Sequence, residues 1–410
     1  MGIEQQIQNE IAASLDALAA DGTLPSEVVG ASFKVERPKR AEHGDLATNA
    51  ALAVQKLAKR PPREIAALLA AQLEASTIVD SVEIAGPGFI NLRLTQVPFL
   101  QVLRDVLSAG DGFGRAPSGS RSRLMIEFVS ANPTGPLLVS HGRGAIYGDG
   151  VARLLEAAGH QVSREYYIND FGNQVRLFGA SVRAAAGGEA PPEGGYGGGY
   201  VSDVAHWLTE HAPEALSSAD DGELQRLCVT RMLDGVPGSA ELPGIKNTLA
   251  SLGIHFDNWY SEESLHRWGR VGASLARLQA RGALVEREGA LFFKSEAEGD
   301  DKDRVVRKSD GVFTYFASDI AYHADKFDRG YDQLLVVLGA HHHGYEARVR
   351  GAVRALGYAD ARFQVLFFQL VRLLRDGKPY KMGKRLGNLI TIEEIVDEID
   401  EAAQRKGAGA

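Results

Sequence analysis

Cysteine is almost missing from this sequence, since Cys228 is the only one among 410 residues. A single thiol excludes an internal disulfide and argues against a zinc site built from cysteines. No apolar run approaches the roughly 20 residues that a membrane-spanning helix needs. The N-terminus also has no basic segment followed by an apolar core, as a secretory signal would have. We therefore expect a cytoplasmic protein with no membrane partner.

A surplus of positive charge is also missing. The chain has 45 Lys and Arg against 53 Asp and Glu, and its formal net charge is −8. Indiscriminate nucleic-acid binding depends on broad neutralisation of phosphates, so any contact with RNA must be local. One basic patch is a candidate for such a contact, and it consists of Arg372, Arg375, Lys378, Lys381, Lys384 and Arg385.

The length of 410 residues exceeds one ordinary core and predicts two or three domains. Residues 1–110 predict a small α+β domain, with strands near residues 31–36, 81–85 and 89–95 among amphipathic helices. Residues 111–122 are rich in Gly, Ser and Pro, and we expect them to form a linker.

The stretch from Leu124 to Gln174 is the most informative part of the chain. Residues 124–129 predict a buried parallel strand, residues 142–159 a helix, and residues 161–168 a second strand. A glycine-containing loop that leads into a helix presents N–H groups and the positive end of the helix dipole, which suits phosphate. This unit is typical of one half of a doubly wound α/β sheet.

A second half of the same sheet is expected further along the chain. Residues 312–316 predict a strand, and a helix that starts at Ser318 would place Tyr315 and Asp319 at its carboxyl edge, where ligands bind in open α/β sheets. Residues 334–338 predict another buried strand.

A largely helical insertion, over about residues 186–303, should separate the two halves. It opens with residues 187–199, which are so rich in glycine that we expect a mobile surface loop.

Two motifs resemble the signatures of class I aminoacyl-tRNA synthetases. The phrase SANPTGPLLVSHGRGA, followed by YYINDFGNQ, is similar to arginyl-tRNA synthetases, whose "HIGH" element usually reads His-Val-Gly-His. The four positions here are Leu138, Val139, Ser140 and His141. The lysine-rich "KMSKS" loop of the family resembles residues 381–385, with Gly383 in place of serine. The order and separation of the motifs make the resemblance specific, and it covers nearly the whole chain.

The resemblance implies an α/β fold. A class I Rossmann-type nucleotide-binding catalytic domain would occupy residues 123–395 and contain the helical insertion. Residues 396–410 would be the truncated start of the family's C-terminal helical region, which binds the anticodon. We expect a fragment, with a natural short paralogue as the alternative.

The N-terminal α+β domain resembles an additional module that contacts tRNA in this family. For His43, Gly44 and Asp45, a structural role in a turn and helix cap is the favoured interpretation, and contact with RNA is the alternative.

The resemblance implies an arginine–tRNA ligase, which activates L-arginine with ATP to arginyl-adenylate and transfers the arginyl group to tRNA(Arg). Family members generally need tRNA for the first step. ATP would carry Mg²⁺, held mainly by its phosphates. Two rival functions stay open: a paralogue that makes arginyl-adenylate without tRNA, and a tRNA-binding paralogue without catalysis. We expect a monomer.

This reaction needs in-line positioning and neutralisation of phosphate charge more than covalent help. By resemblance, the catalytic residues are His141, Lys381 and Lys384. The resemblance also implies a set of ATP-binding residues, which comprises Ser140, His141, Gly142, Gly144, Gly339, His342, His343, Lys381, Met382 and Lys384. An isolated basic loop would more simply be a solvated surface feature, but its pairing with the first motif favours the ATP site.

Selection of arginine needs carboxylates that accept the guanidinium group in two parallel bonds. By resemblance, the arginine-binding residues are Glu127, Asn132, Tyr315 and Asp319. Glu127 is unusual within an apolar strand, because a buried acid without a partner is costly, and a cationic ligand would explain it. The alternative is a structural salt bridge from Glu127 to a nearby arginine.

The run His341-His342-His343 suggests a metal site only superficially, because consecutive loop residues rarely converge on one ion. The family usually has an aspartate at the first of these positions, so His341 is a departure. We expect no metal ion held by the protein.

Overall fold

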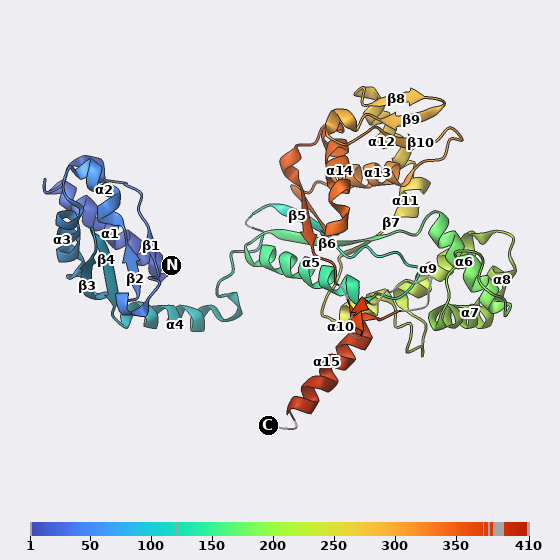
Figure 1. The fold of residues 1–410 in the computed structure, drawn as a ribbon, viewed down its shortest axis with the longest axis horizontal. Coiled ribbons are helices and arrows are strands. Elements are labelled where there is room, and N and C mark those ends of the chain that lie inside the picture. Colours follow the sequence, from blue (N-terminus) through green and yellow to red (C-terminus); the bar gives the residue numbers. More distant parts are fainter. Residues whose placement is uncertain (1, 120, 372, 376–377, 380–388, 408–410) are drawn as a thin grey trace. The chain divides into compact units, whose positions relative to one another are not determined.

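The computed structural model describes residues 2–119, 121–371, 373–375, 378–379 and 389–407. The chain forms two compact units, Met1–Gly114 and Arg115–Ala410, and the division falls within the stretch expected to be the linker (Figure 1). No helix in the described part of the chain is both long and apolar enough to cross a lipid bilayer.

The first unit is a four-stranded antiparallel sheet, in the order β1-β2-β4-β3, packed against helices. Its elements are α1 (Ile3–Ala20), β1 (Val35–Glu36), β2 (Leu46–Thr48), α2 (Ala50–Ala58), α3 (Pro62–Leu73), β3 (Val79–Ala85), β4 (Phe89–Leu94) and α4 (Val97–Ala109). The helical spacing of Ile7, Ile11 and Leu15 buries all three in the core. The strand expected over residues 31–36 is only two residues long, β1.

The turn at Gly44 and Asp45 has a structural role in this unit. Gly44 has a φ of 95°, and a Cβ atom there would lie 2.5 Å from the Leu92 carbonyl oxygen, so only glycine fits. The Asp45 carboxylate accepts a hydrogen bond of 2.9 Å from the N–H of Leu94. The expected structural turn is therefore present, but Asp45 fixes the end of β4 and does not cap a helix.

The second unit contains a five-stranded parallel sheet in the order β12-β11-β5-β6-β7. Its strands are β5 (Arg123–Glu127), β6 (Gln161–Ile168), β7 (Asn258–Ser261), β11 (Gln333–Gly339) and β12 (Phe363–Phe368). The chain order runs from β5 outward to β7 on one side and then to β11 and β12 on the other. The topological switch point therefore lies between β5 and β11, the usual place for a ligand in such sheets.

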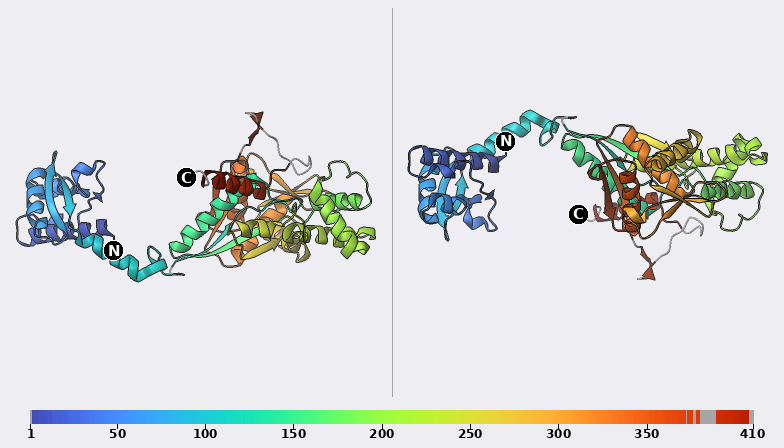
Figure 2. Two further views of the ribbon diagram at one scale, coloured as in Figure 1. Left: turned by 90° about the horizontal axis from the view of Figure 1, so that it is seen from below. Right: turned by 90° about the horizontal axis from the view of Figure 1, so that it is seen from above.

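Helices cover both faces of this sheet (Figure 1). They are α5 (Val139–Ala157), α10 (Ile245–Ser251), α13 (Tyr315–Asp328) and α14 (His343–Ala355). Two further helices of this unit, α6 (Asn173–Ala186) and α15 (Ile392–Gly407), pack mainly against other helices. One face packs against α5 and α10, and the other against α13 and α14. Figure 2 shows α15 beside α5, and residues of both helices line a shared apolar groove.

The expected insertion is not continuous, because β7 pairs with β6 and belongs to the central sheet. Before it lie α7 (Gly199–His211), α8 (Pro213–Ser217) and α9 (Asp221–Asp234). After it lie α11 (Glu262–Arg267), α12 (Arg270–Ala280), β8 (Leu284–Arg287), β9 (Ala290–Phe293) and β10 (Arg304–Arg307). The glycine-rich loop is anchored rather than free, because Tyr196 is buried and its ring packs edge-on against Phe178.

Two strand predictions differ from the structure. Residues 312–316 do not form a strand, because α13 already begins at Tyr315, and the Thr314 hydroxyl just before it donates to the Val305 carbonyl. The strand expected over residues 124–129 ends at Glu127, because Val129 turns into the left-handed region with a φ of 66°.

Buried charges join α13 to the sheet. Lys326 is fully buried and pairs with Glu127 of β5, and its ammonium group lies 4.0 Å from the centre of the Tyr322 ring. Glu165 of β6 is fully buried as well and accepts hydrogen bonds from Arg329, at 2.8 Å, and from the Tyr322 hydroxyl, at 2.7 Å. These pairs lower the pKa of Glu165 against the opposing effect of its burial.

Two glycines of α5 allow a matched test of how this helix packs against the end of β5. A Cβ atom at Gly148 would lie 2.3 Å from Phe128 Cγ, whereas nothing lies within 4 Å of a Cβ atom at Gly150. We expect Gly148→Ala to lower the free energy of unfolding by about 1–3 kcal/mol. Gly150→Ala should raise it by up to about 1 kcal/mol, because alanine restricts the unfolded chain. Urea unfolding measures both, and equal effects would contradict the packing described.

Candidate functional site

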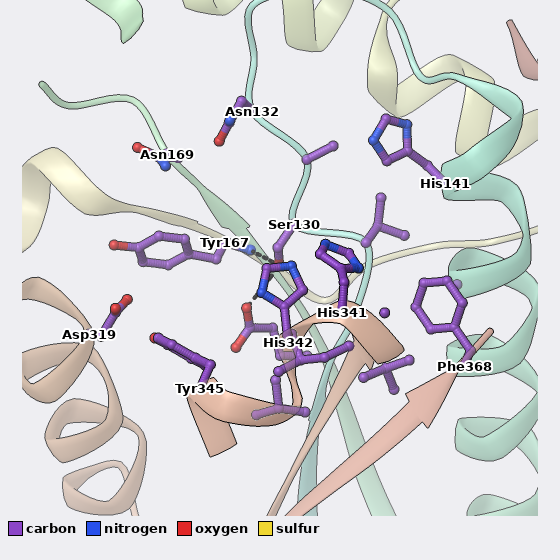
Figure 3. A pocket seen from close by; sticks show the side chains of 18 of the residues that line it. Ser130, Asn132, His141, Tyr167, Asn169, Asp319, His341, His342, Tyr345 and Phe368 are labelled. Carbon is purple, nitrogen blue, oxygen red and sulfur yellow. Dashed lines mark hydrogen bonds between the residues drawn. The ribbon is translucent and has the colours of Figure 1, made fainter. Parts of the chain in front are cut away.

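A cavity of about 480 Å³ opens at the carboxyl edge of the parallel sheet (Figure 3). Its walls come from the loop after β5, the start of α5, the end of β6, the middle of α13 and the segment after β11. The cavity therefore lies over the switch point between β5 and β11.

The cavity brings together most of the site residues predicted within the described part of the chain. They are Glu127, Asn132, Ser140, His141, Gly144, Asp319, Gly339 and His342. Lys381, Met382 and Lys384 lie outside the described residues. Residues remote in sequence thus meet at one edge of one sheet.

Three predicted residues do not line this cavity. Tyr315 is 55% exposed and lies against the loop after β6, where a Cβ atom on Gly172 would be 3.4 Å from its hydroxyl. Gly142 lies one residue after His141 on α5, so it faces a different side of the helix, towards Ile392. The ring of His343 packs on Phe367, with 3.9 Å between the ring centres.

His141 has a defined orientation at the start of α5. Its Nδ1 accepts a hydrogen bond of 2.9 Å from the N–H of Leu138, the residue just before the helix. A neutral ring held in this way carries its hydrogen on Nε2. His141 can therefore act as a donor through Nε2 while Nδ1 stabilises the helix start.

Residues that precede and follow the stretch 371–389 adjoin this site. On one side, Leu370 lines the cavity. On the other, the N–H of Val139 donates to the Ile390 carbonyl at 3.0 Å, and the N–H of Ile392 donates to the Leu137 carbonyl at 3.2 Å. Leu138 lies between these bonds; it is 7% exposed and does not line the cavity.

Asp319 supplies a partly buried acid on the opposite side of the cavity from His141 (Figure 3). Burial raises the pKa of its carboxyl group to about 6, and a hydrogen bond from Tyr345 opposes that rise. Desolvation of this kind makes a carboxylate receptive to a cation that replaces the lost water.

Glu127 already has a cationic partner in the protein. Its carboxylate pairs with Lys326 and accepts a hydrogen bond of 2.9 Å from Ser130. The structural ion pair, the alternative interpretation of Glu127, is therefore present, although the partner is a lysine rather than an arginine. Glu127 still lines the cavity, so its carboxylate contributes to the acidic side.

The backbone after β5 is strained where it enters the cavity. Val129 and Ser130 have φ values of 66° and 42°, which residues other than glycine rarely adopt. The Ser130 hydroxyl holds this turn, because it donates to Glu127 and accepts a hydrogen bond of 3.2 Å from the N–H of Tyr167. Asn132 follows and is held by Gln174 at 2.9 Å.

Sequence reasoning missed one buried acid, Glu262, which lies near the cavity without lining it. It follows β7 directly and forms side-chain hydrogen bonds with Ser318 and Tyr167. Burial, and secondarily the negative charge of Asp319, raise the pKa of Glu262 to about 8. The sequence signal that could have revealed it is Ser261. A serine that can cap a helix marks the point where a strand ends and a helix begins, and Glu262 is the next residue.

The histidines after β11 form one rim of the cavity. His341 and His342 both line it, and their ring centres are 3.9 Å apart. Burial, and secondarily the neighbouring His341, lower the pKa of His342. Within the described residues, no group of three or more His, Cys, Asp or Glu is placed to hold a metal ion.

Comparison with known proteins gives the same family for both units. Residues 5–94 match the arginyl tRNA synthetase N terminal domain, and residues 103–190 and 247–408 match the catalytic domain of class I (R) tRNA synthetases. The chain is 44% identical to the arginine–tRNA ligase of Citrifermentans bemidjiense and 43% identical to that of Geobacter sp. strain M21. Each alignment covers 98% of this chain and 73% of the relative.

A solved structure shows the same fold. The arginyl-tRNA synthetase of Thermus thermophilus superposes with a TM-score of 0.65 at 20% identity, over 98% of this chain and 70% of that one. The expected α/β fold with an additional N-terminal domain is thus confirmed. The chain belongs to the arginyl-tRNA synthetase family, whose members are class I aminoacyl-tRNA ligases.

Proposed function

We propose that this chain activates L-arginine with ATP and transfers the arginyl group to tRNA(Arg). The observation that carries the proposal is one cavity with acids on one side and a helix start with His141 on the other. The curated relatives are named arginine–tRNA ligases. They support this reading over the two rival functions, which no observation favours.

In this reading, the acidic side of the cavity receives the guanidinium group. Asp319 and Glu127 offer carboxylates, and Tyr345 orients Asp319. Glu262 is a further buried acid, which forms a hydrogen bond with Tyr167 outside the cavity lining. A guanidinium group would favour the ionised form of Asp319 and bind the carboxylates that line the cavity through charge-assisted hydrogen bonds. The carboxylate of the amino acid would then point across the cavity towards ATP.

The α-phosphate of ATP would lie near the start of α5. The helix dipole and the Nε2–H of His141 can stabilise negative charge that develops on the phosphate. We propose that Lys381 and Lys384 complete this side, because Leu370 earlier in the chain lines the cavity and Ile390 later in the chain bonds to the start of α5. Mg²⁺ would arrive on the phosphates of ATP. We also propose that the protein is a monomer and that it functions in the cytoplasm.

The direct test is exchange of pyrophosphate into ATP, with and without L-arginine and tRNA(Arg). We expect exchange that requires arginine and, as the family resemblance implies, tRNA. Exchange that does not need tRNA would favour the paralogue that makes arginyl-adenylate without tRNA. Tight tRNA binding without exchange in either condition would favour a non-catalytic tRNA-binding protein.

His141→Asn separates the two roles of this histidine. The shorter amide keeps an acceptor near the N–H of Leu138, but it loses the donor that Nε2 supplies. We expect kcat of exchange to fall about 100-fold or more, with the KM for arginine within about twofold of the original value. A melting temperature close to that of the unmodified chain controls for folding. A KM effect alone would contradict a role at the phosphate.

The raised pKa of Asp319 predicts that arginine affinity depends on pH. The carboxyl group is largely protonated below its pKa of about 6, so the ionised form that binds guanidinium becomes more abundant as pH rises. Between pH 5.5 and 7.5 we expect arginine to bind about fourfold more tightly. Calorimetry in buffers of different ionisation enthalpy should show proton release at pH 6. Asp319→Asn should weaken binding and flatten this pH dependence, and an unchanged slope would rule out Asp319 as its source.

A further inference from the structure

The loop between β5 and α5 is held from outside by two tyrosine hydroxyl groups. Tyr166 of β6 donates to the Ala131 carbonyl at 2.8 Å, and Tyr200 of α7 donates to the Thr134 carbonyl at 3.2 Å. Asn132, which lines the cavity, lies between these two carbonyl groups in the chain (Figure 3). The backbone on both sides of Asn132 is therefore fixed by a side chain from another element.

The sequence of this loop explains why it needs donors from outside. Pro133 and Pro136 have no N–H group, so they cannot donate hydrogen bonds within the loop. Thr134 is 1% exposed, and a buried carbonyl group without a partner is costly. The hydroxyl group of Tyr200 satisfies this carbonyl group. Burial raises the pKa of Tyr200, so the hydroxyl group keeps its proton at neutral pH and remains a donor.

One side of α6 supports both Tyr200 and Asn132. The Asn132 amide donates to Gln174 at 2.9 Å. Phe178, four residues after Gln174, stacks on the Tyr200 ring, with 6.3 Å between ring centres and 20° between planes. Residues four apart lie on the same side of a helix, so both contacts come from one surface of α6. The position of Tyr200 at the start of α7 is therefore linked to the position of the loop.

We propose that Tyr200 is a positioning residue for L-arginine and that it acts through Asn132. The inference rests on the proposed function, in which Asn132 contributes to arginine binding. Because Nδ2 of Asn132 donates to Gln174, Oδ1 is the acceptor that this amide presents to a cationic group of the substrate. The bond from Tyr200 fixes the backbone two residues later and so keeps Oδ1 in the orientation that arginine requires. A helix of the insertion thereby determines the affinity for arginine.

The first test is Tyr200→Phe, which removes the hydroxyl group and keeps the ring. We expect the KM for arginine in pyrophosphate exchange to rise about 10-fold, an effect typical of the loss of one buried hydrogen bond. The kcat and the KM for ATP should stay within about twofold, because the start of α5 has its own backbone contacts with Ile390 and Ile392. The melting temperature should stay within a few degrees. Tyr147→Phe, at an exposed tyrosine of α5, is the matched control and should change none of these values.

A double-mutant cycle with Asn132→Ala separates positioning from a general effect on the structure. Asn132→Ala alone should weaken arginine binding at least as much as Tyr200→Phe does. In the Asn132→Ala background, Tyr200→Phe should change the KM for arginine by less than about twofold, because the group through which it acts is gone. Tyr166→Phe, which removes the bond on the other side of Asn132, should show the same dependence. An equal effect of Tyr200→Phe in both backgrounds, or an effect in neither, would overturn the inference.

Calorimetric binding of L-arginine to the same variants gives a measurement that does not depend on catalysis. The dissociation constant should rise about 10-fold in Tyr200→Phe, and this rise should disappear in the Asn132→Ala background. Absence of exchange together with this pattern of binding would reject the proposed function and retain the inference. Exchange by the unmodified chain, with arginine binding unaffected by Tyr200→Phe, would do the reverse.

Discussion

The pairing of buried charges between α13 and the parallel sheet determines how the site is assembled. An unpaired buried charge costs several kcal/mol, so α13 is stable only where Lys326 meets Glu127 and Arg329 meets Glu165. Asp319 precedes Lys326 by seven residues, about two helical turns, and therefore lies on the same side of α13. The two ion pairs thus set the rotation of α13 that brings Asp319 to the cavity.

The same constraint explains the strained turn after β5. Glu127 is held by Lys326, while the chain must turn immediately to deliver Asn132 to the cavity. The left-handed residues Val129 and Ser130 make that turn at a cost of order 1–3 kcal/mol each. The Ser130 hydroxyl offsets part of this cost by bonding to Glu127 and to the backbone of β6. Strain at this point is therefore a consequence of placing an ion pair and a ligand-facing loop side by side.

Local patterns predicted those parts of the fold that depend on neighbouring residues. The end of the preceding helix at Gly159 and the turn residues after Ile168 predicted the bounds of β6, Gln161–Ile168, and the apolar run 334–338 lies within β11. Patterns could not reveal that Lys326, distant in sequence, neutralises Glu127, because a charge at helical spacing is normally solvated. The burial of Glu262 could not be predicted for a related reason. It results from the pairing of β7 with β6, which joins segments distant in sequence. Long-range pairing of strands and charges is thus the information that periodicity does not contain.

The leucine at position 138 illustrates how a signature residue can differ while the site keeps its arrangement. The segment after the lysine-rich motif joins the start of α5 through backbone groups, from Leu137 and Val139 to Ile390 and Ile392. Backbone hydrogen bonds do not depend on the side chain at the position between them. Leu138 can therefore bury its apolar side chain and still leave its N–H to orient His141. The backbone contact between the start of α5 and residues 390–392 is therefore independent of the side chain at position 138.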